Sequence, residues 1–253
     1  PKDPEVCSAA ATAIGNIPDR QAVDELIKLM DLTFPQAGAN SGTISTEMRD
    51  RYAASRPAIL KSLQTLTGWD FQDAEPWRAF WEKEQKSWKP GKANADTTKL
   101  KKWSDPGYGF VIDKPGDKWV FDRSETYKDY RIYMSRRTED ALQAYVFVWA
   151  ARNASGMSAA NKANEWMDSY RNRYKDIKEE TVKVENIRIG KAKGVAQSFT
   201  GRNAHGTASK VRDVFVVHNG FMFVVGQWLK SGEDDKSVAT EAVKAQDSFR
   251  LTD

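Results

Sequence analysis

The side chains most often used in catalysis and metal binding are scarce in this chain of 253 residues, which has one cysteine and two histidines. Cys7 lies among small apolar residues at helical spacing, which favours a buried thiol, and a single cysteine excludes an internal disulfide. His205 lies in a polar turn and His218 precedes an Asn-Gly pair, so both are expected to be exposed. These three residues cannot form a Cys/His metal cluster. The sequence therefore predicts no catalytic residue, no metal site and no cofactor.

Three Gly-containing or acidic stretches could be ligand loops. "GKAKG" (190–194) lacks the longer spacing and final Lys-Ser/Thr of a phosphate loop. "GEDDKS" (232–237) lacks the alternating ligands and central glycine of a calcium loop and fits a helix start better. "GFVIDKPGDKW" (109–119) alternates like a strand that ends at Pro115-Gly116. No Gly-x-Ser-x-Gly elbow occurs, although residue counts alone do not exclude a Ser-His-Asp set, so a hydrolase stays as a third, weaker alternative.

Positive charge concentrates in the second part of the chain. Residues 1–90 hold 11 Lys/Arg against 13 Asp/Glu, whereas residues 91–253 hold 28 against 22. The positive side chains do not form the dense stripe that nucleic-acid binding requires, so no specific nucleic acid is predicted. Basic and aromatic residues in loops are the candidate contacts with an anionic protein patch. These candidates are Lys99, Lys101, Lys102, Trp103, Lys114, Lys118, Arg136, Arg137, Arg202 and His205.

The first third of the chain has helical periodicity. Apolar residues at i, i+3, i+4 and i+7 predict helices over 5–15, about 19–32, 46–66, where Pro57 should kink or restart the helix, and 74–88. The aromatic stripe of the last helix is expected to be core. "AATAIGNIPDRQAVDELIKLM" and "LTGWDF" with the following Trp and Phe residues resemble a HEAT-type helical repeat. The resemblance implies a HEAT-like domain over 1–88 with a docking groove, either continued by further repeats or packed on the second domain. A polar loop over 33–46 and a linker over 89–106 complete this part.

From residue 107 the period changes to that of strands. Strands are expected over 108–113, 130–137, 142–153, 181–190 and 192–201, a hairpin over 209–230, and helices over 158–177 and 231–252. The 142–153 strand is apolar on both faces and should be central. Asn219-Gly220 requires a type I′ turn. The predicted fold class is α+β, with an antiparallel sheet flanked by helices over 107–253 behind the helical N-terminal segment.

Four segments of this part, "GFVIDKPGDKW", "ANEWMDSY", "VVHNGFMFVVGQW" and "AVKAQDSFRL", resemble the PsbP-like fold that is shared with the Mog-type Ran-binding proteins. The resemblance covers about residues 107–252 and rests on structural motifs. It implies a non-enzymatic accessory or binding module, attached to a larger assembly and, in bacteria, often outside the cytoplasm. A periplasmic or cell-envelope location is therefore favoured, with the cytoplasm still open.

The function expected from these observations is non-catalytic protein binding by an accessory or scaffold subunit of a larger bacterial assembly. Its partners would be other protein subunits. No apolar run approaches the roughly 18 residues of a membrane span, so any membrane association would be peripheral. The alternative is a small-molecule or lipid-binding module with a pocket between sheet and helix, near Trp149 and Trp166. The sequence leaves open the partner, the oligomeric state, any bound ligand, and any repeats or signal sequence that precede Pro1.

Overall fold

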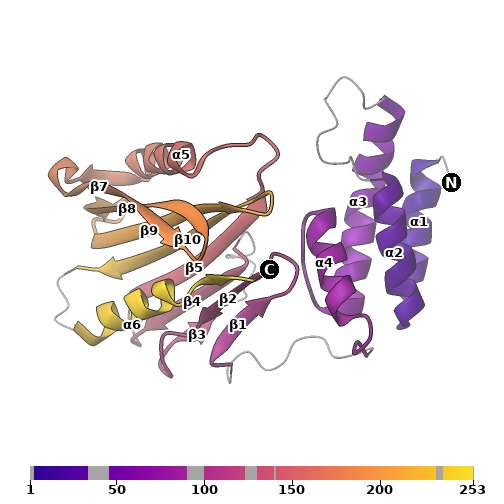
Figure 1. Cartoon of the computed structure of the whole chain (residues 1–253), viewed down its shortest axis with the longest axis horizontal. Helices are drawn as coiled ribbons and strands as arrows, with labels where there is room; N and C mark the ends of the chain where they lie inside the picture. The colour runs from indigo at the N-terminus through magenta and orange to yellow at the C-terminus, as the bar shows by residue number, and fades with distance from the viewer. Residues whose placement is uncertain are drawn as a thin grey trace. The chain divides into compact units, whose positions relative to one another are not determined.

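The structure is a computed structural model that describes residues 3–33, 46–89, 100–122, 130–139, 141–231 and 236–252. It divides the chain into two compact units, which Figure 1 colours along the sequence. Unit 1 contains Pro1–Asp96 and Pro106–Tyr108, and unit 2 contains Thr97–Asp105 and Gly109–Asp253. We describe each unit by itself.

Unit 1 is helical. Its helices are α1 (Pro4–Gly15), α2 (Arg20–Thr33), α3 (Thr46–Thr67) and α4 (Ala74–Glu84). The Asp3 carboxylate accepts hydrogen bonds from the first backbone amides of α1, as an N-cap should. Gly15 allows α1 and α3 to approach closely, because a Cβ there would lie 2.2 Å from the Ser62 hydroxyl. The helix α3 continues through Pro57, so the predicted restart there does not occur.

Three aromatic residues of α4 belong to the core of unit 1, as predicted, whereas the predicted helix over 74–88 ends at Glu84 and leaves Trp88 beyond it and half-buried. Trp77, Phe80 and Trp81 are at most 6 % exposed. The Trp77 indole donates to the Phe71 carbonyl oxygen at 2.9 Å, and the Trp81 indole donates to the Asp24 carboxylate. Each buried indole N–H therefore has an acceptor, which removes the cost of burying it.

Unit 2 is built on a sheet of eight antiparallel strands. Seven of them lie in the order β3-β4-β5-β10-β9-β8-β6, and β7 pairs with β8 as well. The strands are β3 (Val120–Phe121), β4 (Ile132–Arg137), β5 (Leu142–Arg152), β6 (Tyr174–Ile177), β7 (Lys183–Ile189), β8 (Ala192–Asn203), β9 (Ala208–His218) and β10 (Phe221–Lys230). The central position predicted for β5 is confirmed, since it pairs with both β4 and β10.

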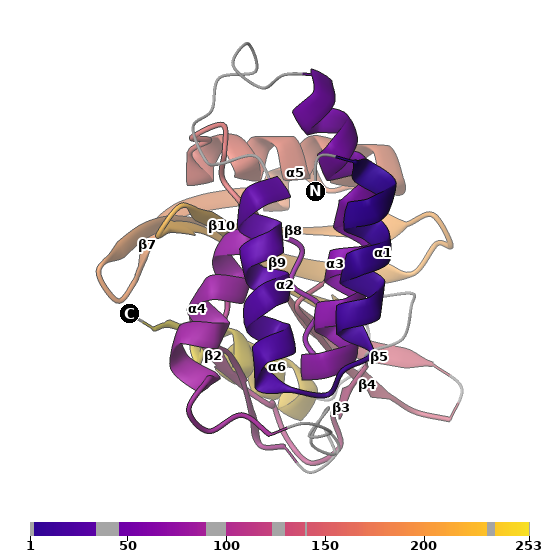
Figure 2. The ribbon, with the colours of Figure 1, turned by 90° about the vertical axis from the view of Figure 1, so that its right-hand side faces the viewer.

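Two helices cover opposite faces of this sheet. Figures 1 and 2 show α5 (Ala159–Arg173) on one face and α6 (Lys236–Asp247) on the other. The side chain of Ser158 caps α5 by accepting from the Asn161 amide, as predicted. A small second sheet, β1 (Lys102–Asp105), β2 (Phe110–Asp113) and β11 (Arg250–Leu251), has the order β1-β2-β11. Phe110 of this sheet packs on Phe223 and Phe249, so the small sheet lies on the α6 side.

The α+β fold class and the Asn-Gly hairpin are confirmed. Asn219 and Gly220 both have positive φ, 48° and 77°, as a type I′ turn requires. Two helix predictions in unit 2 extended too far, as did the helix predicted over 74–88 in unit 1. Tyr174–Ile177, expected in a helix, forms β6, and Arg250–Leu251 forms β11. Tyr174–Ile177 pairs with β8, and Arg250–Leu251 pairs with β2. This pairing determines the conformation of both segments, although neither has the alternation of polar and apolar residues that is typical of a strand.

Part of the segment predicted as a linker is a strand. Lys102–Asp105 pairs with β2 and alternates exposed and buried, with Trp103 and Asp105 inward. The buried carboxylate of Asp105 forms an ion pair with Arg131, whose Nε lies 3.2 Å from the Asp105 Oδ2. The polar composition of this segment predicted a solvent-exposed linker and gave no sign of this buried pair. Most of the predicted loop over 33–46 and residues 90–99 of the linker lie outside the described residues.

Candidate functional site: a basic groove beside the β7–β8 hairpin

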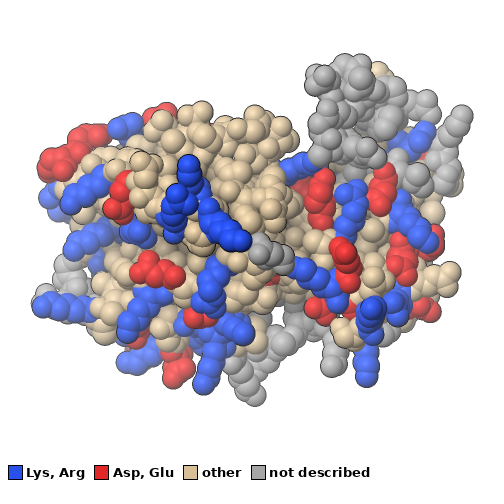
Figure 3. All heavy atoms as spheres, viewed as in Figure 1, with Lys and Arg blue, Asp and Glu red and all other residues tan. Residues whose placement is uncertain are grey.

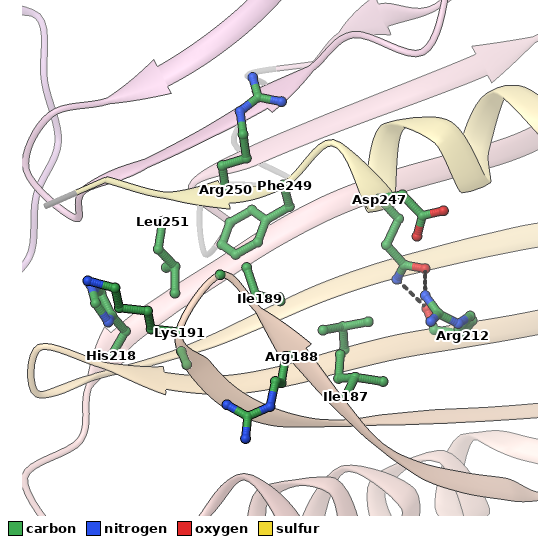
Figure 4. Close-up of a pocket in the computed structure, with 14 residues that line it drawn as sticks. Ile187, Arg188, Ile189, Lys191, Arg212, His218, Asp247, Phe249, Arg250 and Leu251 are labelled. Carbon is green, nitrogen blue, oxygen red and sulfur yellow. Dashed lines mark hydrogen bonds between the residues drawn. The ribbon is translucent and has the colours of Figure 1, made fainter.

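A groove with a volume of about 750 Å³ lies on the α6 side of unit 2. Its lining comes from the β7–β8 hairpin, from β9, from the end of α6 and from β11, as Figure 4 shows. Its apolar lining residues are Ile187, Ile189, Ala192, Val214, Phe249 and Leu251. Four cationic side chains accompany them, Arg188, Lys191, Arg212 and Arg250. Asp247 is the one carboxylate among the described lining residues, so the groove is net positive.

The β7–β8 hairpin positions two of these cations. Gly190 turns the chain with a φ of 59°, and Ile189 pairs with Ala192 directly across the turn. Because successive side chains of a strand alternate, Ile187 and Ile189 are half-buried while Arg188 between them is exposed. Neither Arg188 nor Lys191 forms an ion pair within the described part of the chain. Their charges are therefore available to an anion.

The other two cations are tied to the framework. Arg212 donates to the side-chain oxygen of Gln246 at 2.5 Å and lies 3.7 Å from the Glu185 carboxylate. Arg250 donates to the Asp113 carboxylate at 3.2 Å. Gln246 is 4 % exposed and also donates to the carbonyl oxygens of Arg212 and Val225, at 3.0 and 2.6 Å. This bonded network fixes the end of α6 against β9 and β10, and with it one wall of the groove.

His218 adds an unsatisfied polar atom to the groove. It ends β9 and lines the groove near Lys191 and Leu251 (Figure 4). Its Nε2 is buried and has no hydrogen-bond partner among the described residues. The sequence predicted His218 to be exposed at the hairpin tip, whereas its side chain is only partly exposed. A hydrogen-bonding group of a ligand in the groove could satisfy this nitrogen.

The surface around the groove is rich in positive charge. In Figure 3, Lys and Arg atoms gather on the face of unit 2 around the β7–β8 hairpin and the C-terminal segment, with Asp and Glu atoms interspersed. In Figure 4, Arg188 and Arg250 point away from the apolar side chains next to them, so the cations flank the apolar lining. A groove of this kind suits a ligand that carries both carboxylates and apolar groups. Chemically, the groove can bind and orient such a ligand.

A second cavity, with a volume of about 720 Å³, lies on the α5 side of the sheet. Its wall contains four aromatic rings, those of Tyr145, Tyr170, Tyr174 and Trp228. The sequence predicted a cavity on this side near Trp149 and Trp166. Those two rings instead contact each other with Lys162 above both, and the cavity lies beside the other end of α5.

Two of the predicted contact residues are buried. Trp103 is 6 % exposed and its ring contacts Phe121, so it packs inside unit 2 and is not a surface aromatic. Arg136 is 8 % exposed and donates to the Glu241 carboxylate at 2.7 Å. Trp103 was expected in the linker and Arg136 at the exposed end of a strand, and both occupy inward positions of strands. They are corrections to the predicted contact surface.

The basic residues of the small sheet and its surroundings lie near the surface. Lys101 and Lys102 are exposed, and the Lys114 amide donates to the Lys101 carbonyl oxygen at 2.8 Å. Lys118 and Arg137 are exposed and line a shallow hollow of about 330 Å³ between β3 and β4. These five residues thus form two small groups, neither of which contributes to the basic groove.

The remaining predicted contacts lie on the turn between β8 and β9. Arg202 and His205 are exposed, and His205 lines the second cavity. Lys99 lies outside the described residues. For all of the exposed candidates, contact with a partner stays a prediction.

Sequence reasoning missed the groove residues Arg188, Arg212 and Arg250. They lie on three different elements, and only the pairing of β7 with β8 and of β11 with β2 brings them to the same groove. Lys191 was noticed only inside a rejected phosphate-loop pattern. The available signal was the alternation "NIRIGK", which places a basic residue between two isoleucines next to a tight turn.

Within the described residues no group of three or more His, Cys, Asp or Glu side chains is arranged to hold a metal ion. The described helices include none that combines the length and apolar character needed to cross a membrane.

No protein-family model matches this chain, and no curated protein matches it either. Several solved structures are similar at low identity. The cyanobacterial PsbP protein of Synechocystis sp. PCC 6803 is 10 % identical, with 66 % of this chain and 99 % of that chain covered and a TM-score of 0.42. LpqN, involved in cell envelope biogenesis of Mycobacterium tuberculosis, is 11 % identical over 57 % and 86 % of the two chains, with a TM-score of 0.41. The Ran-binding protein Mog1p of Saccharomyces cerevisiae is 9 % identical over 60 % and 95 %, with a TM-score of 0.35.

Proposed function

We propose that this protein is a non-catalytic, protein-binding accessory or scaffold subunit of a larger assembly, and that its basic groove holds an acidic segment of a partner protein. The observation that carries the proposal is the pair Arg188 and Lys191, two cations without ion-pair partners in the described part of the chain, beside a floor of isoleucine, phenylalanine and leucine side chains. Such a surface gains from acidic side chains through charge and from apolar side chains through burial.

The dimensions and composition of the groove support a peptide segment as the ligand. Its volume of about 750 Å³ is within the usual range for a binding pocket. Its mixed lining matches the common anatomy of protein interfaces, in which an apolar centre is surrounded by a polar rim. Arginine, which contributes three of the four cations, can also bind carboxylates through two parallel hydrogen bonds.

Two parts of the sequence interpretation remain proposals. We propose that the four helices of unit 1 form a HEAT-like segment, which the side-by-side packing of α1, α2 and α3 supports. We also propose the division into a helical domain (1–88), a linker and a sandwich domain (107–253), in which the predicted linker (89–106) is shortened by strand β1 (Lys102–Asp105), a part of unit 2. In this arrangement unit 1 would supply a second docking surface for the same assembly.

The first test measures binding of the octapeptide EDLEFDLE to the full chain by isothermal titration calorimetry. We expect binding that weakens about tenfold between 50 and 300 mM NaCl, because salt screens exposed charges. The double variant Arg188→Glu/Lys191→Glu should lose at least about thirtyfold in affinity, since it replaces attraction with repulsion at two positions.

The matched control is Lys178→Glu/Lys183→Glu, which makes the same change in net charge at two exposed residues outside the groove. Its affinity should stay within about threefold of the wild type, because only general electrostatics change. If both double variants lose affinity equally, or if the basic peptide KKLKFKLK binds as tightly as EDLEFDLE, the proposal fails.

A further inference from the structure

The second cavity of unit 2 has the composition of a small-molecule site. Tyr145 of β5 and Trp228 of β10 are stacked, with ring centroids 5.4 Å apart and an angle of 4° between their planes. Tyr170 of α5 and Tyr174 of β6 meet edge to face at 5.6 Å. Four rings from four elements therefore form the apolar part of the wall. This arrangement can hold one flat apolar group by stacking or edge contacts.

The polar part of the cavity is positively charged. Arg173, Lys230 and His205 line it, and among the described lining residues there is no Asp or Glu. The turn that carries His205 is fixed by Asn203, whose side-chain oxygen accepts from the amides of His205 and Thr207, both at 3.0 Å. The rim thus carries cationic side chains at the ends of α5 and β10 and a hydrogen-bonded turn, which together can attract an anion.

The positive charges at the cavity favour an anionic ligand over a cationic one. Aromatic faces by themselves attract cations. Here, however, the Arg173 guanidinium already lies 5.0 Å from the centre of the Tyr170 ring. A second cation entering beside Arg173 and Lys230 would be repelled, whereas a carboxylate would be attracted.

We propose that this cavity binds a small organic anion that carries an aromatic ring, of the aromatic carboxylate class. The ring lies against the tyrosine and tryptophan side chains, and the carboxylate faces Arg173 and Lys230. This site is separate from the basic groove and goes beyond the proposed protein-binding function, because the two cavities share no lining residue among those described.

The test titrates the ¹⁵N-labelled full chain with benzoate and follows amide chemical shifts. Benzylamine keeps the ring and reverses the charge, and acetate keeps the charge and removes the ring. We expect benzoate to bind at least about five times more tightly than either, because each of them lacks one of the two interactions. The shifts should lie in residues 170–174 and 203–207.

Two variants with a control assign the interactions to residues. Arg173→Gln should weaken benzoate binding about tenfold, which corresponds to one charge-assisted contact of about 1.4 kcal/mol. Arg171→Gln removes the same charge two residues earlier on α5, from a side chain that pairs with Asp168 and Glu179 outside the cavity, and should leave binding unchanged. Tyr145→Leu should weaken benzoate and leave acetate unaffected.

Three outcomes would overturn the proposal. The first is equal or tighter binding of benzylamine, and the second is an equal effect of Arg173→Gln and Arg171→Gln. The third is the absence of benzoate binding to a wild-type chain whose amide spectrum shows that it is folded.

Discussion

Arg212 and Asp213 are neighbours on β9, yet they belong to opposite faces of the sheet and to opposite kinds of environment. Arg212 lines the basic groove on the α6 side and is bonded to Gln246. Asp213 points to the α5 side, because Val211 and Phe215, two residues before and after it, pack against residues of α5. It is 1 % exposed, and neither carboxylate oxygen has a partner at normal hydrogen-bonding geometry among the described residues, although the Tyr170 hydroxyl lies near enough to influence it.

The contrast is between two neighbouring charged groups, one hydrogen-bonded into the framework on the α6 side (the satisfied side) and one buried on the α5 side (the strained side). On the α6 side, Arg212 is bonded to Gln246, and Glu241 accepts from the Trp119 indole at 2.8 Å and from Arg136 at 2.7 Å, whereas the Nε2 of His218 stays unpaired among the described residues. On the α5 side, burial raises the pKa of the Asp213 carboxyl to about 7, against the lowering influence of the Tyr170 hydroxyl, Arg173 and Arg212. Tyr145, at the cavity wall, also interacts with this carboxyl. A buried acid of this kind costs stability, and such costs are common beside ligand sites.

The largest effect is expected on the satisfied side. Gln246→Leu removes the hydrogen bonds that Gln246 makes with Arg212 and with the Val225 carbonyl oxygen, and it leaves that oxygen buried without its side-chain donor. We expect a loss of about 3 kcal/mol in the free energy of unfolding, measured by urea denaturation. Lys244→Gln, on the same helix at an exposed position, is the control and should change it by less than about 0.5 kcal/mol. An unchanged midpoint for Gln246→Leu would show that the framework is not needed.

A smaller, pH-dependent effect is expected on the strained side. Because the pKa of Asp213 is about 7 in the folded chain and near 3.8 when unfolded, the unfolded state ionises first as the pH rises. The folded state therefore loses about 2–3 kcal/mol between pH 5 and pH 8 through this residue. Asp213→Asn should remove that loss, so that the variant is more stable than the wild type at pH 8 and nearly equal to it at pH 5.

The control for this prediction is Gln197→Leu. Gln197 pairs with Asp213 across the sheet, is 3 % exposed and carries no charge. This variant should keep the pH dependence of the wild type in urea denaturation. If Asp213→Asn and wild type instead lose stability in parallel between pH 5 and pH 8, Asp213 is not a strained acid.

Local signals made much of the fold predictable. Asn219-Gly220 specifies a type I′ turn, Ser158 caps α5, and the apolar residues on both faces of β5 indicate a central strand. Each of these three signals depends only on residues that are neighbours in the sequence. Short polar strands escaped prediction. Lys102–Asp105 and Tyr174–Ile177 become strands through pairing with distant partners, β2 and β8, which no local pattern encodes.

The candidate sites were much less predictable than the fold. Positive charge and a pocket between sheet and helix could be anticipated from composition and element order. The groove itself depends on strand pairing, which brings Arg188 and Arg250 to the lining of one groove. The pKa of Asp213 depends on its burial beneath α5, which an isolated "VRDVF" segment does not reveal.

The central claim is that unit 2 carries two separate binding sites on opposite faces of one sheet. The most direct test maps amide chemical shifts of the ¹⁵N-labelled full chain with EDLEFDLE and, in a second titration, with benzoate. We predict that the peptide shifts residues 187–192 and 249–251, that benzoate shifts residues 170–174 and 203–207, and that saturating one ligand leaves the affinity for the other unchanged. Overlapping shifts, or competition between the two ligands, would contradict the account.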